Sequence, residues 1–279
     1  MLKIVTDSAS DLLPEFVREH DIGVVPFSVT ADGEKYLKDG IDINASEFYK
    51  MQRETKHFFK TSLPSMQDYL DEFNKHPGID ILCFCLSSKF SGSYQSAVNA
   101  AREAMEDGSR KVVVVDTLSA SMGYGIKIMD AVELRAQGKG AEEIAAAVMQ
   151  EPSSICLTVD TLEYLQRGGR IGKVSAFAGS LLNIKPIIQL VDGELTPHSR
   201  VRGRKRALST LEEIFEKETG GAYSQYRVGI LHSDCHDEAD EFVRHINTKY
   251  GVEAFLQELG LVIGVHIGPS LIAMLFAKK

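Results

Sequence analysis

The chain has 279 residues, 44% of them hydrophobic and 25% charged, with a formal net charge of -8. This composition is typical of a folded globular protein and excludes a disordered or collagen-like chain. Since the length exceeds that at which one hydrophobic core usually stops growing, two domains are expected. The acidic balance disfavours sequence-independent binding to nucleic acid or anionic lipid, so we expect no nucleic acid partner and at most transient membrane contact.

The amino terminus and the cysteines indicate a cytoplasmic protein without a structural metal. Met1–Asp7 runs directly into a strand-like pattern, with no basic segment followed by a long apolar one. The apolar runs are far shorter than the ~20 residues that span a bilayer. Cys83, Cys85, Cys156 and Cys235 form neither a Cys-x-x-Cys pair nor a zinc-spaced cluster. Cys83 and Cys85 point to one face of an apolar strand, where buried thiols are expected.

The first half of the chain predicts a parallel α/β/α domain. Leu2–Val5, Ile79–Leu86 and Val112–Val115 are continuously apolar, as strands buried on both faces are, and amphipathic stretches alternate with them. A polar loop follows each strand. Because ligands bind at the carboxyl ends of strands in an open parallel sheet, we expect the binding site at these loops.

Local signals mark several helix ends in this half. Pro14 suits a first helical turn, and Ser65 with Asp68 forms a capping-box pattern. Gly138 is placed to end a helix over residues 125–137.

The second half predicts a separate α+β domain with a largely antiparallel or mixed sheet. Polar residues gather around Pro152, so we place the boundary there, giving domains of residues 1–152 and 153–279. Asp192-Gly193 predicts a hairpin turn. The expected strands are Ile155–Val159, Pro186–Val191, Leu195–Thr196, Arg227–Leu231 and Val252–Leu256, and the expected helices are Ala207–Lys217 and Asp237–Tyr250.

Two hydroxyl-rich loops are candidate anion receptors. No dinucleotide fingerprint, P-loop or His-Glu-x-x-His motif is present, which disfavours common nucleotide and metalloprotease chemistry. Ser91-Gly92-Ser93 follows a predicted strand, where hydroxyls and free backbone N–H groups can receive a carboxylate or phosphate. Thr61-Ser62-Leu63-Pro64-Ser65 is the second such loop. Taken alone, Ser91-Gly92-Ser93 is better explained as an ordinary helix cap, and a cap is also the other interpretation of the second loop.

Three further segments carry candidate functional residues. His266 interrupts an apolar, glycine-containing stretch and is either a ligand contact or a core histidine bonded to backbone. Arg167-Gly168-Gly169-Arg170 suits recognition of phosphate or an acidic partner, or is a solvated turn. The run Arg200–Arg206 is a docking patch or a charged helix start. It lacks the interleaved aromatic residues that stack nucleic acid bases.

In this order, the segments resemble the DegV family over nearly the whole chain. The matching motifs are Thr6-Asp7-Ser8, the Thr61–Ser65 loop, Phe90–Ala97, Tyr164–Ile171 and Gly264–Pro269. The family usually has Gln at the position of Leu63 and commonly Gly at that of Ser270.

The resemblance implies a carrier without a catalytic site or cofactor of its own. It implies a long-chain fatty acid bound between the domains, with Thr61, Ser62, Gly92, Ser93 and His266 around its carboxylate. It also implies a separate ATP-dependent fatty acid kinase as partner, which makes an acyl phosphate that feeds phospholipid synthesis. Arg170 and Arg202 would then dock the kinase, and the apolar stretch from Val174 to Ile184 would line the acyl tunnel.

Two other functions remain open from the residues. Ser93 and His266, aided by Asp116, would suit a serine hydrolase of lipid esters, although Gly92-Ser93-Tyr94 lacks the Gly-x-Ser-x-Gly elbow. A transcriptional regulator using Arg200–Arg206 would bind duplex DNA in a salt-sensitive way.

Overall fold

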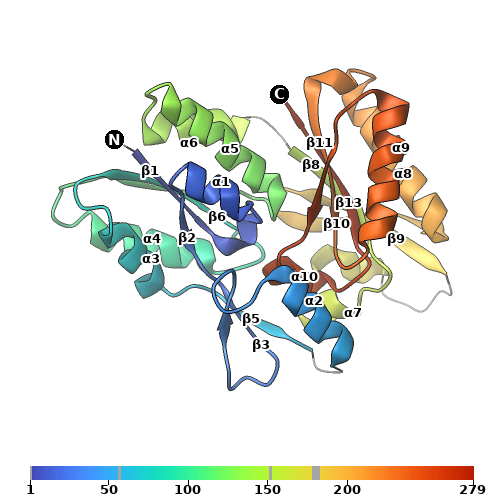
Figure 1. The fold of residues 1–279 in the computed structure, drawn as a ribbon, viewed down its shortest axis with the longest axis horizontal. Coiled ribbons are helices and arrows are strands. Elements are labelled where there is room, and N and C mark those ends of the chain that lie inside the picture. The colour runs from blue at the N-terminus through green and yellow to red at the C-terminus, as the bar shows by residue number, and fades with distance from the viewer. Residues whose placement is uncertain (1, 56–57, 151–152, 178–182) are drawn as a thin grey trace.

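Two sheets divide the molecule into two halves that lie side by side (Figure 1). The computed structural model describes residues 2–55, 58–150, 153–177 and 183–279. One sheet is built from strands of the first half of the chain and is parallel, and the other from strands of the second half and is mixed. The predicted fold class, an α/β half followed by an α+β half, is therefore confirmed.

The first sheet is parallel and covered by helices on both faces. Its strands run in the order β2-β1-β6-β7, and their continuously apolar side chains pack on both sides. The thiols of Cys83 and Cys85 lie 3.9 Å apart on one face, as predicted, and both are buried. The strands are β1 (Leu2–Asp7), β2 (Gly23–Val25), β6 (Asp80–Cys85) and β7 (Val112–Asp116); α3 (Met66–Asn74) and α4 (Ser93–Ala104) cover one face, α5 (Met122–Ala136) and α6 (Ala141–Gln150) the other.

The predicted helix ends in this half are confirmed. Pro14 opens α1 (Pro14–Glu19), and Ser65 caps α3 in a reciprocal capping box with Asp68. Gly138 follows α5 with a φ of 82°, a left-handed conformation that glycine adopts without strain. A second capping box, of Asn44 with Glu47, starts α2 (Ala45–Glu54).

A small antiparallel sheet in the first half was not predicted. Its strands are β3 (Ser28–Thr30), β4 (Leu37–Lys38) and β5 (Lys60–Ser62), in the order β4-β3-β5. Strands of two or three residues are too short for a periodic pattern, so pairing with distant neighbours decides them. Because β5 contains Thr61, this sheet fixes the position of one candidate ligand residue.

The second sheet runs in the order β10-β9-β8-β13-β11-β12, and only β11 and β12 pair in parallel. Asp192 and Gly193, with φ values of 50° and 80°, form the predicted hairpin turn between β9 and β10. The strands are β8 (Ser153–Thr158), β9 (Ile184–Val191), β10 (Glu194–Arg202), β11 (Tyr226–His232), β12 (Phe255–Glu258) and β13 (Ile272–Lys278).

Three strands of this sheet differ from expectation. The strand expected over Leu195–Thr196 is longer, because β10 pairs with β9 along Glu194–Arg202. The interior strand β13 was missed, although its six-residue apolar run Ile272–Ala277 is typical of a strand buried on both faces. The strand expected over Val252–Leu256 begins only at Phe255, because α9 ends at Tyr250 and Gly251 caps it in the left-handed conformation.

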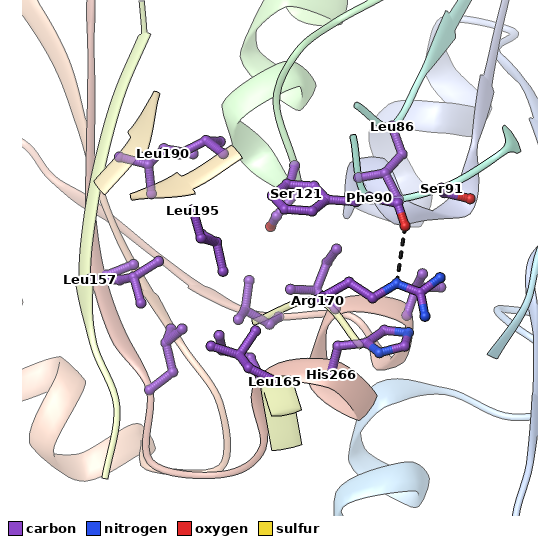
Figure 2. Close-up of a pocket in the computed structure, with 18 of the residues that line it drawn as sticks. Leu86, Phe90, Ser91, Ser121, Leu157, Leu165, Arg170, Leu190, Leu195 and His266 are labelled. Carbon is purple, nitrogen blue, oxygen red and sulfur yellow. Dashed lines mark hydrogen bonds between the residues drawn. The ribbon is translucent and has the colours of Figure 1, made fainter. Parts of the chain in front are cut away.

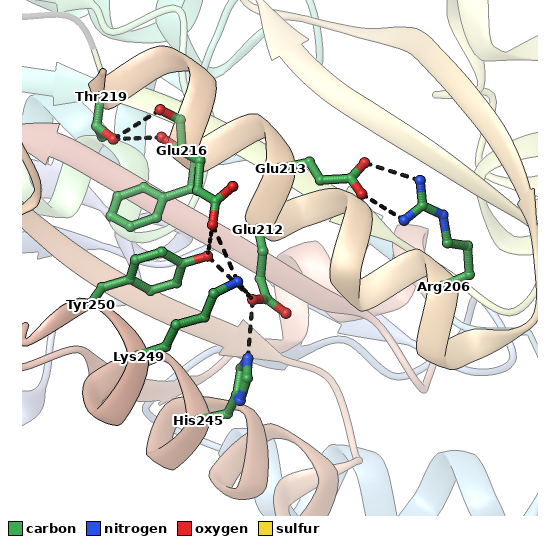
Figure 3. Close-up of polar contacts among 9 residues, drawn as sticks. Arg206, Glu212, Glu213, Glu216, Thr219, His245, Lys249 and Tyr250 are labelled. Carbon is green, nitrogen blue, oxygen red and sulfur yellow. Dashed lines mark hydrogen bonds and ion pairs between the residues drawn. The ribbon is translucent and has the colours of Figure 1, made fainter. Parts of the chain in front are cut away.

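Helices α8 (Arg204–Thr219) and α9 (His236–Tyr250) cover the outer face of the second sheet. Figure 3 shows polar side chains joining them: Glu212 accepts hydrogen bonds from Lys249 at 2.8 Å and from the Tyr250 hydroxyl at 3.2 Å. His245 lies 3.0 Å from the same carboxylate. Glu212 is only 7% exposed, so these donors compensate the burial of its charge.

The two halves interlock where they meet. Helix α10 (Leu261–Ile267), from the second half, packs Leu261 and Val265 into the core of the first. In return, Met122 of α5 packs into the core against the inner face of the second sheet. The proposed boundary residue Pro152 lies outside the described residues, and the division at this point stays a prediction. None of the described helices is long and apolar enough to cross a membrane.

Candidate functional site

A cavity of about 130 Å³ lies between the inner face of the second sheet and helix α10. Figure 2 shows leucines of β8, β9 and β10 on one side, and Arg170 with His266 on the other. Most of the wall is apolar. The apolar wall includes Ile155, Leu157, Leu190, Leu195, Leu231 and Ala273, and the polar side chains at the cavity are Thr61, Ser91, Ser121, Arg170 and His266.

Thr61 and His266 meet at the polar end. The Thr61 hydroxyl oxygen lies 2.8 Å from Nε2 of His266, which joins strand β5 to helix α10. Helix α10 approaches α2 so closely that a Cβ at Gly264 would lie 2.5 Å from the Tyr49 hydroxyl. The glycine therefore lets the helix pack where its histidine can reach Thr61. Of the residues that the sequence grouped around a ligand carboxylate, the structure brings Thr61 and His266 together, and their role in binding stays a prediction.

His266 is neutral at pH 7. Burial, followed by the positive charge of Arg170, lowers the pKa of its imidazole to about 4. Its Nδ1 is buried and has no hydrogen-bond partner among the described residues. With the proton on Nε2, the ring donates to Thr61 and leaves the hydroxyl proton of Thr61 free for a ligand oxygen. The pair thus suits an acceptor such as a carboxylate.

Arg170 supplies a positive charge beside this pair. Its Nε donates to the carbonyl of Phe90 at 3.1 Å, and Nη1 donates to the carbonyl of Gly168 at 2.5 Å. These bonds hold the guanidinium in the cavity wall rather than free in solvent. Arg202, by contrast, ends β10 and is exposed. The two arginines grouped as docking residues therefore have different surroundings, and their docking role stays a prediction.

Ser93 is buried but does not line the cavity. Its hydroxyl donates to Oδ2 of Asp7 at 3.0 Å and lies 2.6 Å from the Tyr69 hydroxyl. Ser91, two residues earlier, lines the cavity instead. Gly92 is the exposed N-cap of α4. Ser62 is exposed and, as the neighbour of Thr61 in a strand, points the opposite way.

Asp7, which belongs to the motif Thr6-Asp7-Ser8, supports the site from the end of β1. It is fully buried and accepts from the Tyr124 hydroxyl at 2.5 Å and the Leu86 N–H at 2.9 Å, besides Ser93. Burial raises the pKa of its carboxyl, and the hydrogen bonds, which lower the pKa, offset only part of this rise. Asp7 thereby ties the loop after β6 and the starts of α4 and α5 to the end of β1. Its place just past the apolar run Leu2–Val5, at the end of the strand, was the available signal.

Asp11 is a second acidic residue with no role assigned from the sequence. The Ser121 hydroxyl, which lines the cavity, donates to it at 2.5 Å. A Cβ on Gly260, the N-cap of α10, would lie 2.2 Å from Oδ1 of Asp11. Burial raises the pKa of Asp11 to about 7. Asp11 therefore joins the start of α10 to the first half of the molecule.

The geometry does not assemble the hydrolase considered above. Ser93 contacts Asp7 and Tyr69, whereas Nε2 of His266 contacts Thr61, so the nucleophile and base of a triad are not paired. Asp116 accepts from the backbone N–H groups of Ser88 and Leu118. Within the described ranges, no group of three or more His, Cys, Asp or Glu side chains is arranged to hold a metal ion.

Comparisons with known proteins agree on one family. Residues 1–279 match the sequence profile described as uncharacterised protein, DegV family. A DegV domain-containing protein of Caldanaerobacter subterraneus is 33% identical over 100% of this chain and 99% of its own length. A stearic acid-binding protein from Eubacterium ventriosum, with a solved structure, is 32% identical with a TM-score of 0.91, over 100% and 99% of the two chains. A fatty acid-binding DegV family protein from Thermus thermophilus gives 32% identity and a TM-score of 0.88 over the same shares. This chain therefore belongs to the DegV family.

Proposed function

We propose that the protein binds a long-chain fatty acid in the cavity between its halves, with the carboxylate at Thr61 and His266 and the chain along the second sheet. The observation that carries the proposal is the distribution of side chains: an apolar cavity with a hydroxyl, a neutral imidazole and a guanidinium gathered at one end. An amphipathic ligand with one anionic group matches this pattern. Fatty acid binding by the Eubacterium and Thermus relatives supports the same class of ligand.

The energetics favour such a ligand only if its carboxylate is paired. Burying ~12 methylenes at ~0.8 kcal/mol each contributes on the order of 10 kcal/mol before ordering costs. An unpaired buried carboxylate would cancel this gain. Thr61 and Arg170 offer donors at the polar end. Ser62, Gly92 and Ser93 remain proposed contacts, although none of them is among the residues that line the cavity.

The cavity has to widen to hold a long chain. An apolar cavity of about 150 Å³ in another protein takes up benzene, so the space here matches a much smaller molecule than a fatty acid. The hairpin of β9 and β10 is the wall best placed to move, because it lies at an edge of the sheet. Its turn is held by a hydrogen bond from the Ser87 hydroxyl to the carbonyl of Gly193 at 2.9 Å. The predicted tunnel stretch from Val174 to Ile184 begins with a buried valine, and its residues 178–182 lie outside the described residues.

We infer further that the bound carboxylate is presented to a separate ATP-dependent kinase that makes the acyl phosphate for phospholipid synthesis in the cytoplasm. The chain carries no P-loop or other recognised phosphoryl-transfer motif, so the partner would supply that chemistry. The exposed Arg202 suits an electrostatic contact, which mainly governs encounter and orientation.

Fatty acid binding is tested by native mass spectrometry of the purified protein, followed by denaturation and identification of released lipid. We expect one fatty acid per chain. Thr61→Val removes the hydroxyl with little change in shape, and a ten-fold or greater loss of affinity is expected because hydrogen bonds to a charged group contribute roughly 1.5–3 kcal/mol. Thr248→Val, the same change at an exposed threonine of α9 that does not line the cavity, is the matched control. Absence of lipid and of fatty acid uptake by the wild-type protein would contradict the proposal.

The kinase role needs a second measurement. With a matched kinase, ATP and magnesium, Arg202→Glu should lower acyl-phosphate formation while leaving the fatty acid bound. Arg170→Glu is expected to reduce both, because its guanidinium lies in the cavity wall. Unchanged turnover by Arg202→Glu at several ionic strengths would remove this residue from the docking surface.

A further inference from the structure

We propose that Ile155 closes the deep end of the cavity and, with Ala273, limits the length of the acyl chain that the protein accepts. This inference rests on the proposed fatty acid binding and assigns a new role to two residues of the same cavity. Both side chains line the cavity and are almost fully buried, at 5% and 2% exposure.

The register of the sheet places Ile155 farthest from the polar end along β8. Thr158 pairs with Ile272, which follows α10 and its His266 closely in the chain. Leu157 pairs with Ala273, one position deeper, and Ile155 pairs with Leu275, two positions deeper again. Since alternate residues of a strand share a face, Leu157 and Ile155 are successive positions on the cavity side. Leu275 faces the same side but does not line the cavity, so the open space ends near Ile155.

Helix α5 forms a stop directly behind Ile155. A Cβ built on Gly123 would lie 2.5 Å from Cδ1 of Ile155, so the helix backbone contacts the isoleucine without an intervening side chain. The Ser153 hydroxyl donates to the carbonyl of Gly123 at 3.2 Å and fixes the helix against the start of β8. The isoleucine is therefore held between a rigid helix and the sheet.

Truncating Ile155 would lengthen the cavity by the space that its side chain now fills. Met122 and Ile126 of α5 belong to the same apolar cluster as Ile155, so the added space would keep apolar walls. A chain too long for the wild-type cavity would then gain apolar surroundings for its terminal carbons.

Ala273 controls the width of the space before the stop. On β13 it lies between Leu157 of β8 and Leu231 of β11, all on the cavity side of the sheet. A small side chain flanked by two leucines leaves a depression in the floor along which the chain can pass. Leucine at this position would fill the depression and shorten the usable length.

We expect substitutions at the two positions to shift the preferred acyl chain length in opposite directions. Delipidated protein is incubated with an equimolar series of saturated fatty acids of increasing chain length, and the bound species are quantified by native mass spectrometry. Ile155→Ala removes three carbon atoms and should shift the preferred length upward by about two carbons. Ala273→Leu should shift it downward by a similar amount. Ile155→Val should give a smaller upward shift and carries the test if the alanine variant does not fold.

Met274→Ala is the matched control, because Met274 is fully buried on β13 but packs on the opposite face, under α8 and α9. It should lower thermal stability without altering the length distribution. The assignment is overturned if folded Ile155 and Ala273 variants bind the same distribution of chain lengths as wild type, or if the shifts are opposite to those expected. Either result would leave fatty acid binding itself unaffected. If the wild-type protein takes up no fatty acid of any length, fatty acid binding itself is refuted.

Discussion

Replacing Gly168 with alanine should weaken fatty acid binding without unfolding the protein. Gly168 caps α7 (Glu163–Arg167) with a φ of -72° and a ψ of -9°, a conformation that alanine adopts freely. The added Cβ would lie 2.4 Å from Nδ1 of His266 and 3.1 Å from the carbonyl of Tyr164. The added methyl group therefore displaces mainly the imidazole of His266.

The structure sets the size of the effect. A Cβ contact below 3.0 Å is essentially never tolerated, so the ring has to move by more than half an ångström from its 2.4 Å approach. That displacement strains the 2.8 Å contact between His266 and Thr61, which orients the hydroxyl proposed to bind the carboxylate. If one hydrogen bond to the charged group is lost, the cost is roughly 1.5–3 kcal/mol, or about 10- to 150-fold in Kd.

Isothermal titration calorimetry of delipidated Gly168→Ala with a saturated fatty acid measures this change, and thermal unfolding checks the fold. Gly140→Ala is the control, because a Cβ there meets no atom within 4 Å and its φ is not in the left-handed region. A Kd for Gly168→Ala within two-fold of wild type, together with unchanged imidazole NMR shifts of His266, would refute the reasoning.

Three further predictions concern the cavity wall, the helices and pH. Ser87→Ala removes the hydrogen bond to Gly193 that holds the β9–β10 turn, so lipid release should accelerate by roughly five-fold, as about 1 kcal/mol implies; an unchanged stopped-flow release rate would exclude the hairpin as the moving wall. Glu212→Ala removes the acceptor shared by Lys249 and Tyr250 and should lower the free energy of unfolding by roughly 2 kcal/mol in urea titrations. Arg206→Ala, which breaks an exposed ion pair with Glu213, should change the free energy of unfolding by less than about 1 kcal/mol. Equal losses of stability in Glu212→Ala and Arg206→Ala would contradict the distinction between the buried and the exposed carboxylate. The pKa of His266 is lowered to about 4 in the folded state, so the unfolded state binds more protons and this residue's contribution to stability falls as pH drops from about 6.5 to about 4. Asp11 and Asp39 have raised pKa values and change the stability in the opposite direction, so the free energy of unfolding is compared between wild type and His266→Gln to isolate the effect of the histidine. A difference in this free energy that does not change with pH over this window would contradict the prediction.

Much of the fold follows from local sequence. The apolar runs at Ile79–Leu86 and Val112–Val115 predicted interior parallel strands, because a strand buried on both faces requires apolar residues at every position. Ser65 with Asp68, and Asp192 with Gly193, fixed a helix start and a turn through bonds and conformations that involve only neighbouring residues. In the same way, motifs along the chain were enough to indicate the family.

The site depended on contacts between distant residues. Thr61 and His266 are 205 positions apart, and only the packing of α10 on α2 and β5 brings their polar atoms to 2.8 Å. The same packing separates Ser93 from the cavity by engaging its hydroxyl with Asp7, which no spacing in the sequence indicates. It also turns Arg170 into the cavity wall while Arg202 stays exposed. Sequence determined which side chains were available, and tertiary structure decided which of them face the cavity, because burial and hydrogen-bond partners arise only when separate elements pack together.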